Sequence, residues 1–168
     1  PPVTAPEAPG ADLRTTAILA PGAATLARAG LWERLAPYAA PLAVMRIADA
    51  GGAGTNLRAI KDFTATDIGE GPFGWNLPNW LLRREMVARL AELPGVRFLP
   101  GTGTARVLTR STEARIGLSD GTTLSARLLI AADGRASPVR RALGIGATTL
   151  RYGQKALAFA VTHPIPHD

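Results

Sequence analysis

The chain has 168 residues, of which 46% are hydrophobic and 19% charged, so it can bury a core in one domain or in two small lobes. It contains no cysteine, which excludes disulfide scaffolds and thiolate metal sites and suits a reducing compartment. The net charge of +6 comes mainly from arginines that are scattered and not interleaved with aromatic residues, so we expect no nucleic-acid binding.

The first part of the chain is predicted to be mainly helical. Its prolines make residues 1–10 a lead-in without a regular hydrogen-bonded ladder. Apolar residues recur with helical spacing over residues 17–29, and Gly30 supplies the residue that ends this helix. A short helix over residues 31–36 follows, in which Trp32 is expected to anchor the core.

Two strands and a longer helix are predicted next. Alternating apolar residues favour strands over residues 41–49 and 57–64, and residues 67–74 form a glycine-rich loop. Asn79 is placed to cap the helix that follows, which ends before Pro94. The buried stripe of this helix is expected to consist of Leu82, Met86, Leu90 and Leu93.

The second half of the chain is predicted to contain several short strands. Residues 96–99, 104–109 and 113–119 are expected to form a small antiparallel sheet. The Asp-Gly pair within residues 119–121 favours a hairpin turn, because this dipeptide readily adopts a positive φ. Residues 154–162 are predicted to form one more strand.

Residues 128–143 carry the strongest local signal. The five apolar residues 128–132 predict a strand that is buried on both faces, as in a parallel sheet covered by helices. A tight turn follows, and then Ser137 stands where a helix N-cap is expected, with Pro138 at the first helical position. Gly144 lies just past the predicted end of this helix. The predicted unit is therefore strand, turn and helix.

This unit would place Asp133 at the carboxyl end of a buried strand, where open α/β sheets bind ligands. The helix that begins at Pro138 would direct backbone N–H groups at the same place, with Arg135, Arg140 and Arg141 nearby. Such a site suits a pyrophosphate. The alternative, which the residues alone leave open, is a solvated Asp-Gly turn between a strand and a helix.

The motif Asp-Gly-Arg-Ala-Ser-Pro-Val-Arg at residues 133–140 resembles the Asp-Gly motif of class A flavoprotein monooxygenases. Three further blocks, in the same order along the chain, are similar to those of the ubiquinone-biosynthesis hydroxylases within that class. These blocks are residues 12–17 with 30–32, residues 74–82, and residues 152–156 with 166–167. The resemblance covers essentially the whole chain.

The resemblance implies two groups of cofactor-binding residues. Asp133 and Gly134 would contact the nucleotide, and Ser137 and Arg140 would hold the turn or the phosphates. The same Asp-Gly segment would contact both FAD and the pyrophosphate of NAD(P)H.

Two residues outside this segment complete the predicted site. Arg14 would approach the flavin or its phosphates, with an exposed surface arginine as the alternative. Asn79 would contact the adenylate or ribityl part of the cofactor, with the helix cap as the alternative. No residue of the chain is expected to act as a catalytic acid or base.

The family's opening Gly-x-Gly-x-x-Gly turn has no counterpart here, because the glycines at 51–54 lack a strand before them and a helical pattern after them. Its later Gly-Asp block is also missing, so we expect an internal piece of a longer flavoprotein. The predicted fold class is α/β: a fragment of a Rossmann-like, glutathione-reductase-type FAD-binding lobe, a small antiparallel crossover sheet, and part of a β-sheet substrate lobe. The predicted domains are a partial FAD-binding domain (1–42 and 75–150) and a partial substrate-binding domain (43–74 and 151–168).

The function implied by the resemblance is hydroxylation of an aromatic ring, with FAD, NAD(P)H and O2, on a polyprenyl phenol of ubiquinone biosynthesis. The isolated piece is expected to be inactive and to bind FAD weakly or not at all. Two alternatives stay open: a non-catalytic relative that binds isoprenoid lipid or a partner, and a structural fragment that dimerises through strand edges.

The chain is expected in the cytoplasm, because it has neither a secretory signal nor an apolar run long enough to span a membrane. A peripheral association with the inner face of the membrane, a multi-enzyme complex and a homo-oligomer stay open, since the implied substrate is oily. His163 and His167 lack a third ligand, so no metal site is expected.

Overall fold

The computed structural model describes residues 3–51, 56–69, 71–157 and 164. The chain divides into two compact units, one running from Pro2 to Phe98 and the other from Leu99 to Ala156. Each unit is considered by itself. In the part of the chain that the structure describes, none of the helices has the length and apolar character needed to cross a bilayer.

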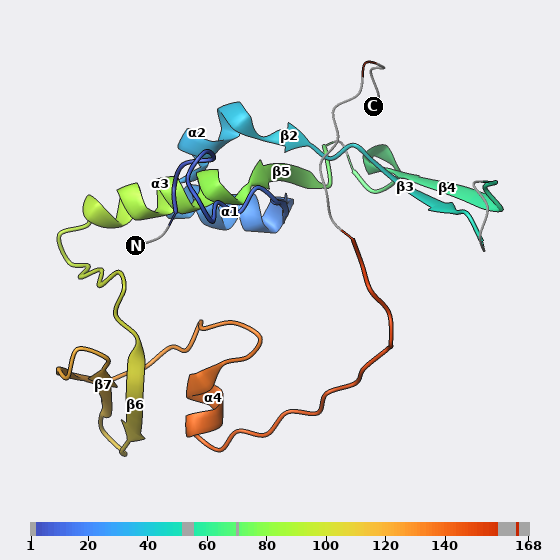
Figure 1. Cartoon of the computed structure of the whole chain (residues 1–168). Helices are drawn as coiled ribbons and strands as arrows, with labels where there is room; N and C mark the ends of the chain where they lie inside the picture. Colours follow the sequence, from blue (N-terminus) through green and yellow to red (C-terminus); the bar gives the residue numbers. More distant parts are fainter. Residues whose placement is uncertain (1–2, 52–55, 70, 158–163, 165–168) are drawn as a thin grey trace. The chain divides into compact units, whose positions relative to one another are not determined.

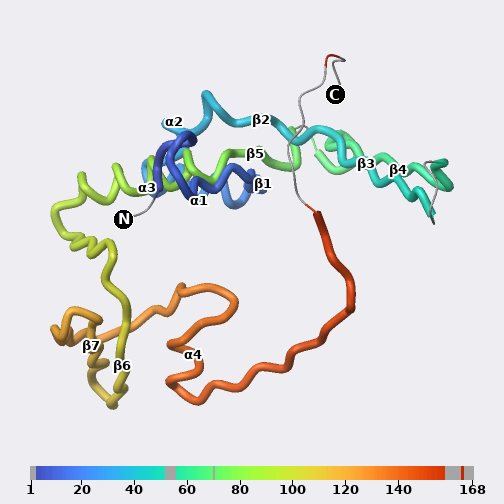
Figure 2. Tube along the Cα trace, viewed as in Figure 1, coloured from blue at the N-terminus to red at the C-terminus, as the bar shows by residue number. Residues whose placement is uncertain are grey.

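The first unit is built on a small antiparallel sheet in the order β1-β5-β2. Figure 1 labels β2 and β5 of this sheet, and Figure 2 labels β1 as well. β1 (Thr15–Leu19) pairs along its whole length with β5 (Gly74–Pro78), and the two-residue β2 (Ala40–Pro41) pairs with the other edge of β5. The predicted helix over residues 17–29 is therefore too long at its start. It begins at Ala20 because the preceding residues are paired with β5.

The first helix of this unit ends at the glycine that the sequence predicts. α1 (Ala20–Arg28) is followed by Gly30 at φ 72°, and α2 (Trp32–Leu35) continues into a short 3₁₀ turn, η1 (Ala36–Tyr38). Trp32 packs against the core and meets Trp75 edge to face, with ring centroids 4.9 Å apart. The predicted core role of Trp32 is confirmed.

α3 (Asn79–Ala91) contributes its first turn to the core. The predicted stripe on this helix was only partly right, since Leu82 is buried but Met86 is 39% exposed. Leu81, which the prediction omitted, is 1% exposed and belongs to the buried cluster. The buried cluster of this unit consists of Leu31, Leu35, Leu77, Leu81 and Leu82.

A two-stranded hairpin, β3 (Val44–Asp49) with β4 (Ala59–Thr64), confirms both strands predicted in this region (Figure 2). A short 3₁₀ turn, η2 (Ala65–Asp67), follows it. Backbone hydrogen bonds fix the base of the hairpin, because Leu42 donates to the Gly74 carbonyl and Phe73 donates to the Leu42 carbonyl, each at 2.9 Å.

The second unit contains the predicted small antiparallel sheet, in the order β6-β7-β8. β6 (Thr104–Thr109) and β7 (Ala114–Leu118) match the predicted strands, and Gly121 at φ 86° makes the predicted turn into β8 (Thr123–Ala126). The strand predicted over residues 96–99 is absent, since no neighbouring segment among the described residues pairs with it.

The buried strand predicted over residues 128–132 was wrong. These residues form no strand, and the side chains of Leu128 and Ile130 are 74% and 78% exposed. A strand buried on both faces needs hydrogen-bonding neighbours at its edges and helices over its faces, and none of the sheets among the described residues includes residues 128–132. The apolar run is therefore left without a strand partner among the described residues.

The helix predicted after this stretch is confirmed as α4 (Pro138–Ala142), with Ser137 as its N-cap and Gly144 at φ 67° beyond its end. Residues 154–157 form no strand, and the rest of the predicted strand at 154–162 lies outside the described residues. His163 and His167 also lie outside them.

Gly74 allows β1 and β5 to approach closely, and we expect Gly74→Ala to destabilise the first unit. A Cβ atom at residue 74 would lie 2.2 Å from the carbonyl oxygen of Ile18 and 2.7 Å from the Cα of Leu19. The free energy of unfolding should fall by about 1–3 kcal/mol, measured by urea denaturation of the full-length protein. Gly69→Ala is the control, because its Cβ would meet no atom within 4 Å. Equal stabilities of the two variants would contradict the prediction.

Candidate functional site

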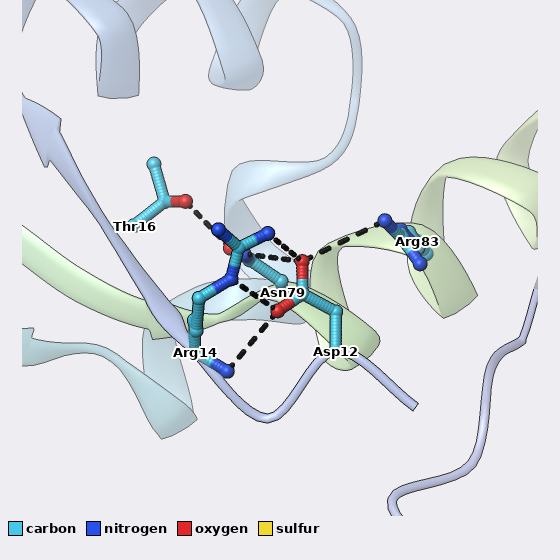
Figure 3. Close-up of polar contacts among 5 residues, drawn as sticks. All are labelled: Asp12, Arg14, Thr16, Asn79 and Arg83. Carbon is cyan, nitrogen blue, oxygen red and sulfur yellow. Dashed lines mark hydrogen bonds and ion pairs between the residues drawn. The ribbon is translucent and has the colours of Figure 1, made fainter. Parts of the chain in front are cut away.

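Five polar side chains gather at the end of the first sheet, and we call them the Asp12 cluster (Figure 3). The β1–β5 pairing brings them together, because two of them precede β1, one lies in it, and two lie in the first turns of α3. The backbone closes this junction, since the N–H of residue 79 donates to the carbonyl of residue 14 at 2.9 Å. The members of the cluster are Asp12, Arg14, Thr16, Asn79 and Arg83.

The Asp12 carboxylate is the centre of the cluster. Arg14 donates to it through two nitrogens, from Nε to Oδ1 at 2.8 Å and from Nη2 to Oδ2 at 2.8 Å. The Asn79 amide donates to Oδ2 at 3.0 Å, and Arg83 Nη2 lies 3.7 Å from the same oxygen. Figure 3 shows the carboxylate between the two arginines. Both predicted site residues of this unit, Arg14 and Asn79, are thus joined through a third side chain.

The members of the cluster differ in burial and in charge. The Asp12 side chain is only 11% exposed, whereas the Arg14 side chain is 71% exposed. Hydrogen bonds from Arg14, and then from Asn79, hold the pKa of the Asp12 carboxyl well below its ordinary value, so it is ionised at neutral pH. With Arg83 also present, the cluster keeps one uncompensated positive charge. The exposed guanidinium therefore fits an anionic group.

The predicted cap by Asn79 was wrong. Asn79 is the first residue of α3, the N-cap position is Pro78, and no side chain caps this helix. The Asn79 amide is instead shared between Asp12 and Thr16, whose hydroxyl donates to Oδ1 at 2.5 Å. An amide that is held by these long-range partners is not available to the backbone of α3.

The other four predicted site residues lie together around α4, in the second unit. Asp133 Oδ2 accepts a hydrogen bond from the Val139 N–H at 3.1 Å, and Ser137 Oγ accepts one from the Arg140 N–H at 3.0 Å. The Ser137 hydroxyl, the Val139 N–H and the charge of Arg140 lower the pKa of Asp133. Gly134 has φ 88°, a backbone conformation that favours glycine, and a Cβ atom there would meet no protein atom within 4 Å.

The phosphate-binding role of the α4 group stays a prediction. The Asp133 carboxylate accepts a hydrogen bond from the Val139 N–H and the Ser137 hydroxyl accepts one from the Arg140 N–H, so these two backbone donors at the start of the helix already have acceptors. One donor there has no acceptor, since Arg140 Nε is buried without a hydrogen-bond partner.

Sequence reasoning assigned no role to three members of the Asp12 cluster, namely Asp12, Thr16 and Arg83. A signal for the first two was present, because both lie in the Asp-x-Arg-Thr-Thr-Ala block on which the family resemblance rests. Arg83 had no such signal, and only the helical spacing from Asn79 places it on the same side of α3. The described residues contain no group of His, Cys, Asp or Glu that could hold a metal ion.

The Asp133 contacts predict a pH dependence of stability. Because its pKa is lower in the folded than in the unfolded chain, its carboxylate stabilises the fold above the ordinary value of 3.8 and loses this effect as the pH falls through the folded-state pKa. The full-length protein should therefore unfold at higher denaturant than its Asp133→Asn variant at pH 7. This difference should shrink below about pH 4. A difference that is constant from pH 7 to pH 3 would contradict the assignment.

Comparisons with known proteins identify the family of the chain. A family model described as "FAD binding domain" matches residues 18–163. The chain is 38% identical over 162 residues to ubiquinone hydroxylase UbiL of Rhodospirillum rubrum, covering 95% of this chain and 36% of that protein. It is 33% identical over 95 residues to ubiquinone hydroxylase UbiM of Neisseria meningitidis, covering 56% of this chain and 21% of that protein. The matched part of the chain thus spans 36% of the length of the first relative and 21% of that of the second.

A solved structure supports the same fold. The tetracycline destructase Tet(55) matches 77% of this chain and 30% of its own, with a TM-score of 0.52 and 16% identity. This likeness concerns the fold alone. The family match, which covers most of the chain, shows that the chain belongs to the FAD binding domain family, as a class A flavoprotein monooxygenase sequence that resembles the ubiquinone hydroxylases.

Proposed function

We propose that this chain is part of an FAD-dependent hydroxylase that uses NAD(P)H and O2 to hydroxylate a polyprenyl phenol in ubiquinone biosynthesis. The observation that carries the proposal is the 38% identity, over 162 residues, to a protein named ubiquinone hydroxylase. The chain spans 36% of that relative, so the proposed activity is that of the whole protein. FAD, when bound, supplies the redox chemistry, and the chain supplies binding, orientation and electrostatics.

In this proposal, Arg14 binds an anionic part of FAD, and Asn79 lies beside the same part. The support is the exposed guanidinium, which keeps N–H groups beyond those that it donates to Asp12. Charge-assisted hydrogen bonds from arginine to phosphate are among the stronger polar contacts in proteins, and their geometry is well defined. Arg14 would therefore contribute both affinity and orientation.

Around α4, Asp133, Gly134 and Ser137 would shape the turn beside the nucleotide, and Arg140 would donate to a phosphate. The support for Arg140 is its buried Nε, which needs an acceptor. We further propose that residues 1–42 and 75–150 belong to a Rossmann-like FAD-binding lobe. The exposed Leu128 and Ile130 would then be covered within the complete lobe.

We propose that residues 43–74 and 151–168 belong to the substrate-binding lobe. In β3 and β4, Met45 pairs with Phe63, and Ile47 lies on the same face opposite Lys61, so this face of the hairpin exposes three apolar side chains beside one lysine. A cavity of about 380 Å³, with a mainly apolar lining, lies at the base of this hairpin between Val44 and Pro72. Such surfaces suit an isoprenoid tail. A polyprenyl substrate would reside in the membrane. We therefore propose that the protein is cytoplasmic and associates with the inner face of the membrane, alone or in a complex.

The binding role of Arg14 predicts that Arg14→Ala weakens FAD affinity. Loss of a charge-assisted hydrogen bond should raise the dissociation constant about ten- to a hundredfold. The measurement is FAD titration of the full-length apoprotein, followed by flavin fluorescence. Arg28→Ala is the matched control, because Arg28 is an exposed arginine whose contact is to Thr25 within α1. Equal dissociation constants of FAD in the two variants would show that Arg14 does not bind FAD.

The whole function is tested by turnover of the full-length protein with FAD, NAD(P)H and a polyprenyl phenol under ¹⁸O₂. We expect NAD(P)H oxidation that depends on the substrate, and one ¹⁸O atom in the product by mass spectrometry. A phenol without the polyprenyl tail is the control and should react poorly. Binding of the polyprenyl phenol without any turnover would instead identify a non-catalytic relative.

A further inference from the structure

Asp12 makes more contacts in the cluster than either residue that the sequence singled out. Its Oδ1 accepts from Arg14 Nε at 2.8 Å and from the Arg14 backbone N–H at 3.2 Å. Its Oδ2 accepts from Arg14 Nη2 at 2.8 Å and from Asn79 Nδ2 at 3.0 Å. Two parallel hydrogen bonds from one guanidinium to one carboxylate fix the plane of the guanidinium.

The same carboxylate also sets the direction of the Asn79 amide. An ionised carboxylate only accepts hydrogen bonds, so the NH2 side of the amide must face Asp12. The amide oxygen then faces Thr16, whose hydroxyl donates to it at 2.5 Å. With both ends assigned, the amide has a single orientation, and Thr16, Asn79, Asp12 and Arg14 form one continuous chain of hydrogen bonds.

The position of Asp12 suits a residue that holds Arg14 in place, and not one that touches a ligand. Its side chain is 11% exposed and lies behind the guanidinium of Arg14, which is 71% exposed. A negative charge in direct contact with a phosphate would also repel it. A negative charge that holds an arginine in place from behind avoids this contact and leaves the outer N–H groups of the arginine available.

We propose that Asp12 is a positioning residue of the FAD site, acting through Arg14 and Asn79 and not by touching the cofactor. The inference rests on the proposed function, because it assumes that Arg14 and Asn79 meet FAD. An arginine that is already fixed loses less conformational freedom when it binds an anion than a freely rotating one does. Asp12 would therefore increase affinity by preorganisation.

Two physical effects of removing the charge of Asp12 have opposite signs, and this makes the proposal testable. Asp12→Asn leaves both cluster arginines without a counter-charge, so electrostatics alone would tighten the binding of an anionic cofactor. Loss of the fixed guanidinium would weaken it instead. The proposal predicts weaker binding, by about tenfold, since charge-assisted bonds are lost and an amide NH2 then faces the guanidinium.

The experiment measures the dissociation constant of FAD for the full-length apoprotein and for the variants Asp12→Asn, Arg14→Ala and the double variant. Glu92→Gln is the matched control, because Glu92 also accepts from two arginines, Arg34 and Arg89, but at the other end of α3. Asp12→Asn should weaken binding by about tenfold in the wild-type background and by no more than about two- to fivefold in the Arg14→Ala background, where only its contact with Asn79 is left to lose. A purely structural role would lower affinity equally in both backgrounds.

Thr16→Val provides a milder variant, in case Asp12→Asn does not fold. It removes only the hydroxyl that orients the Asn79 amide, and it should weaken FAD binding by about two- to fivefold. Thermal unfolding of each apoprotein checks that the variants are folded.

The outcomes separate this inference from the proposed function. If the wild-type protein binds FAD but Asp12→Asn binds it equally or more tightly, or if the effects of Asp12→Asn and Arg14→Ala add, the positioning role is wrong and the proposed function stands. Unchanged affinity in Thr16→Val would also overturn the role given to the Asn79 orientation. If the wild-type protein does not bind FAD at all, both the proposed function and the inference are wrong.

Discussion

The antiparallel pairing of β1 with β5 is the interaction on which the first unit depends. It places the segment before β1 beside the residue that begins α3, and so assembles the Asp12 cluster from positions more than sixty residues apart. It also requires Gly74, whose missing side chain leaves room for the backbone at Ile18. The core leucines lie next to this pairing, since Leu77 of β5 is fully buried. The sheet, the core and the Asp12 cluster therefore all depend on the same pairing of strands.

Features that depend on local sequence were predicted well. Gly30 and Gly144 both adopt a positive φ just beyond a helix, and Ser137 caps α4 through its hydroxyl. The hairpins were also predicted, because strand alternation and the Asp-Gly turn at Gly121 act over a few residues. For the candidate site, the family resemblance selected Arg14 and Asn79, and the structure brings them into one cluster.

Features that depend on distant partners were not predicted. The apolar run at 128–132 has the composition of a buried strand, but a strand exists only where another strand pairs with it, and no described strand pairs with this run. The capping role predicted for Asn79 was wrong for a related reason. Its residue type and position match a helix cap, but its amide is bound to Asp12 and Thr16, which are distant in sequence and come close only in the folded structure. Periodicity and capping rules identify the structures that a segment can adopt. Which of them forms depends on partners that are distant in the sequence.

The closed base of the β3–β4 hairpin has a mechanical consequence. Its strands continue from β2 and lead into β5, and the backbone bonds between Leu42, Phe73 and Gly74 tie the two legs together. Gly74 begins β5, and β5 ends immediately before Asn79. A shift of the hairpin base would therefore act on the same strand that leads into the Asp12 cluster.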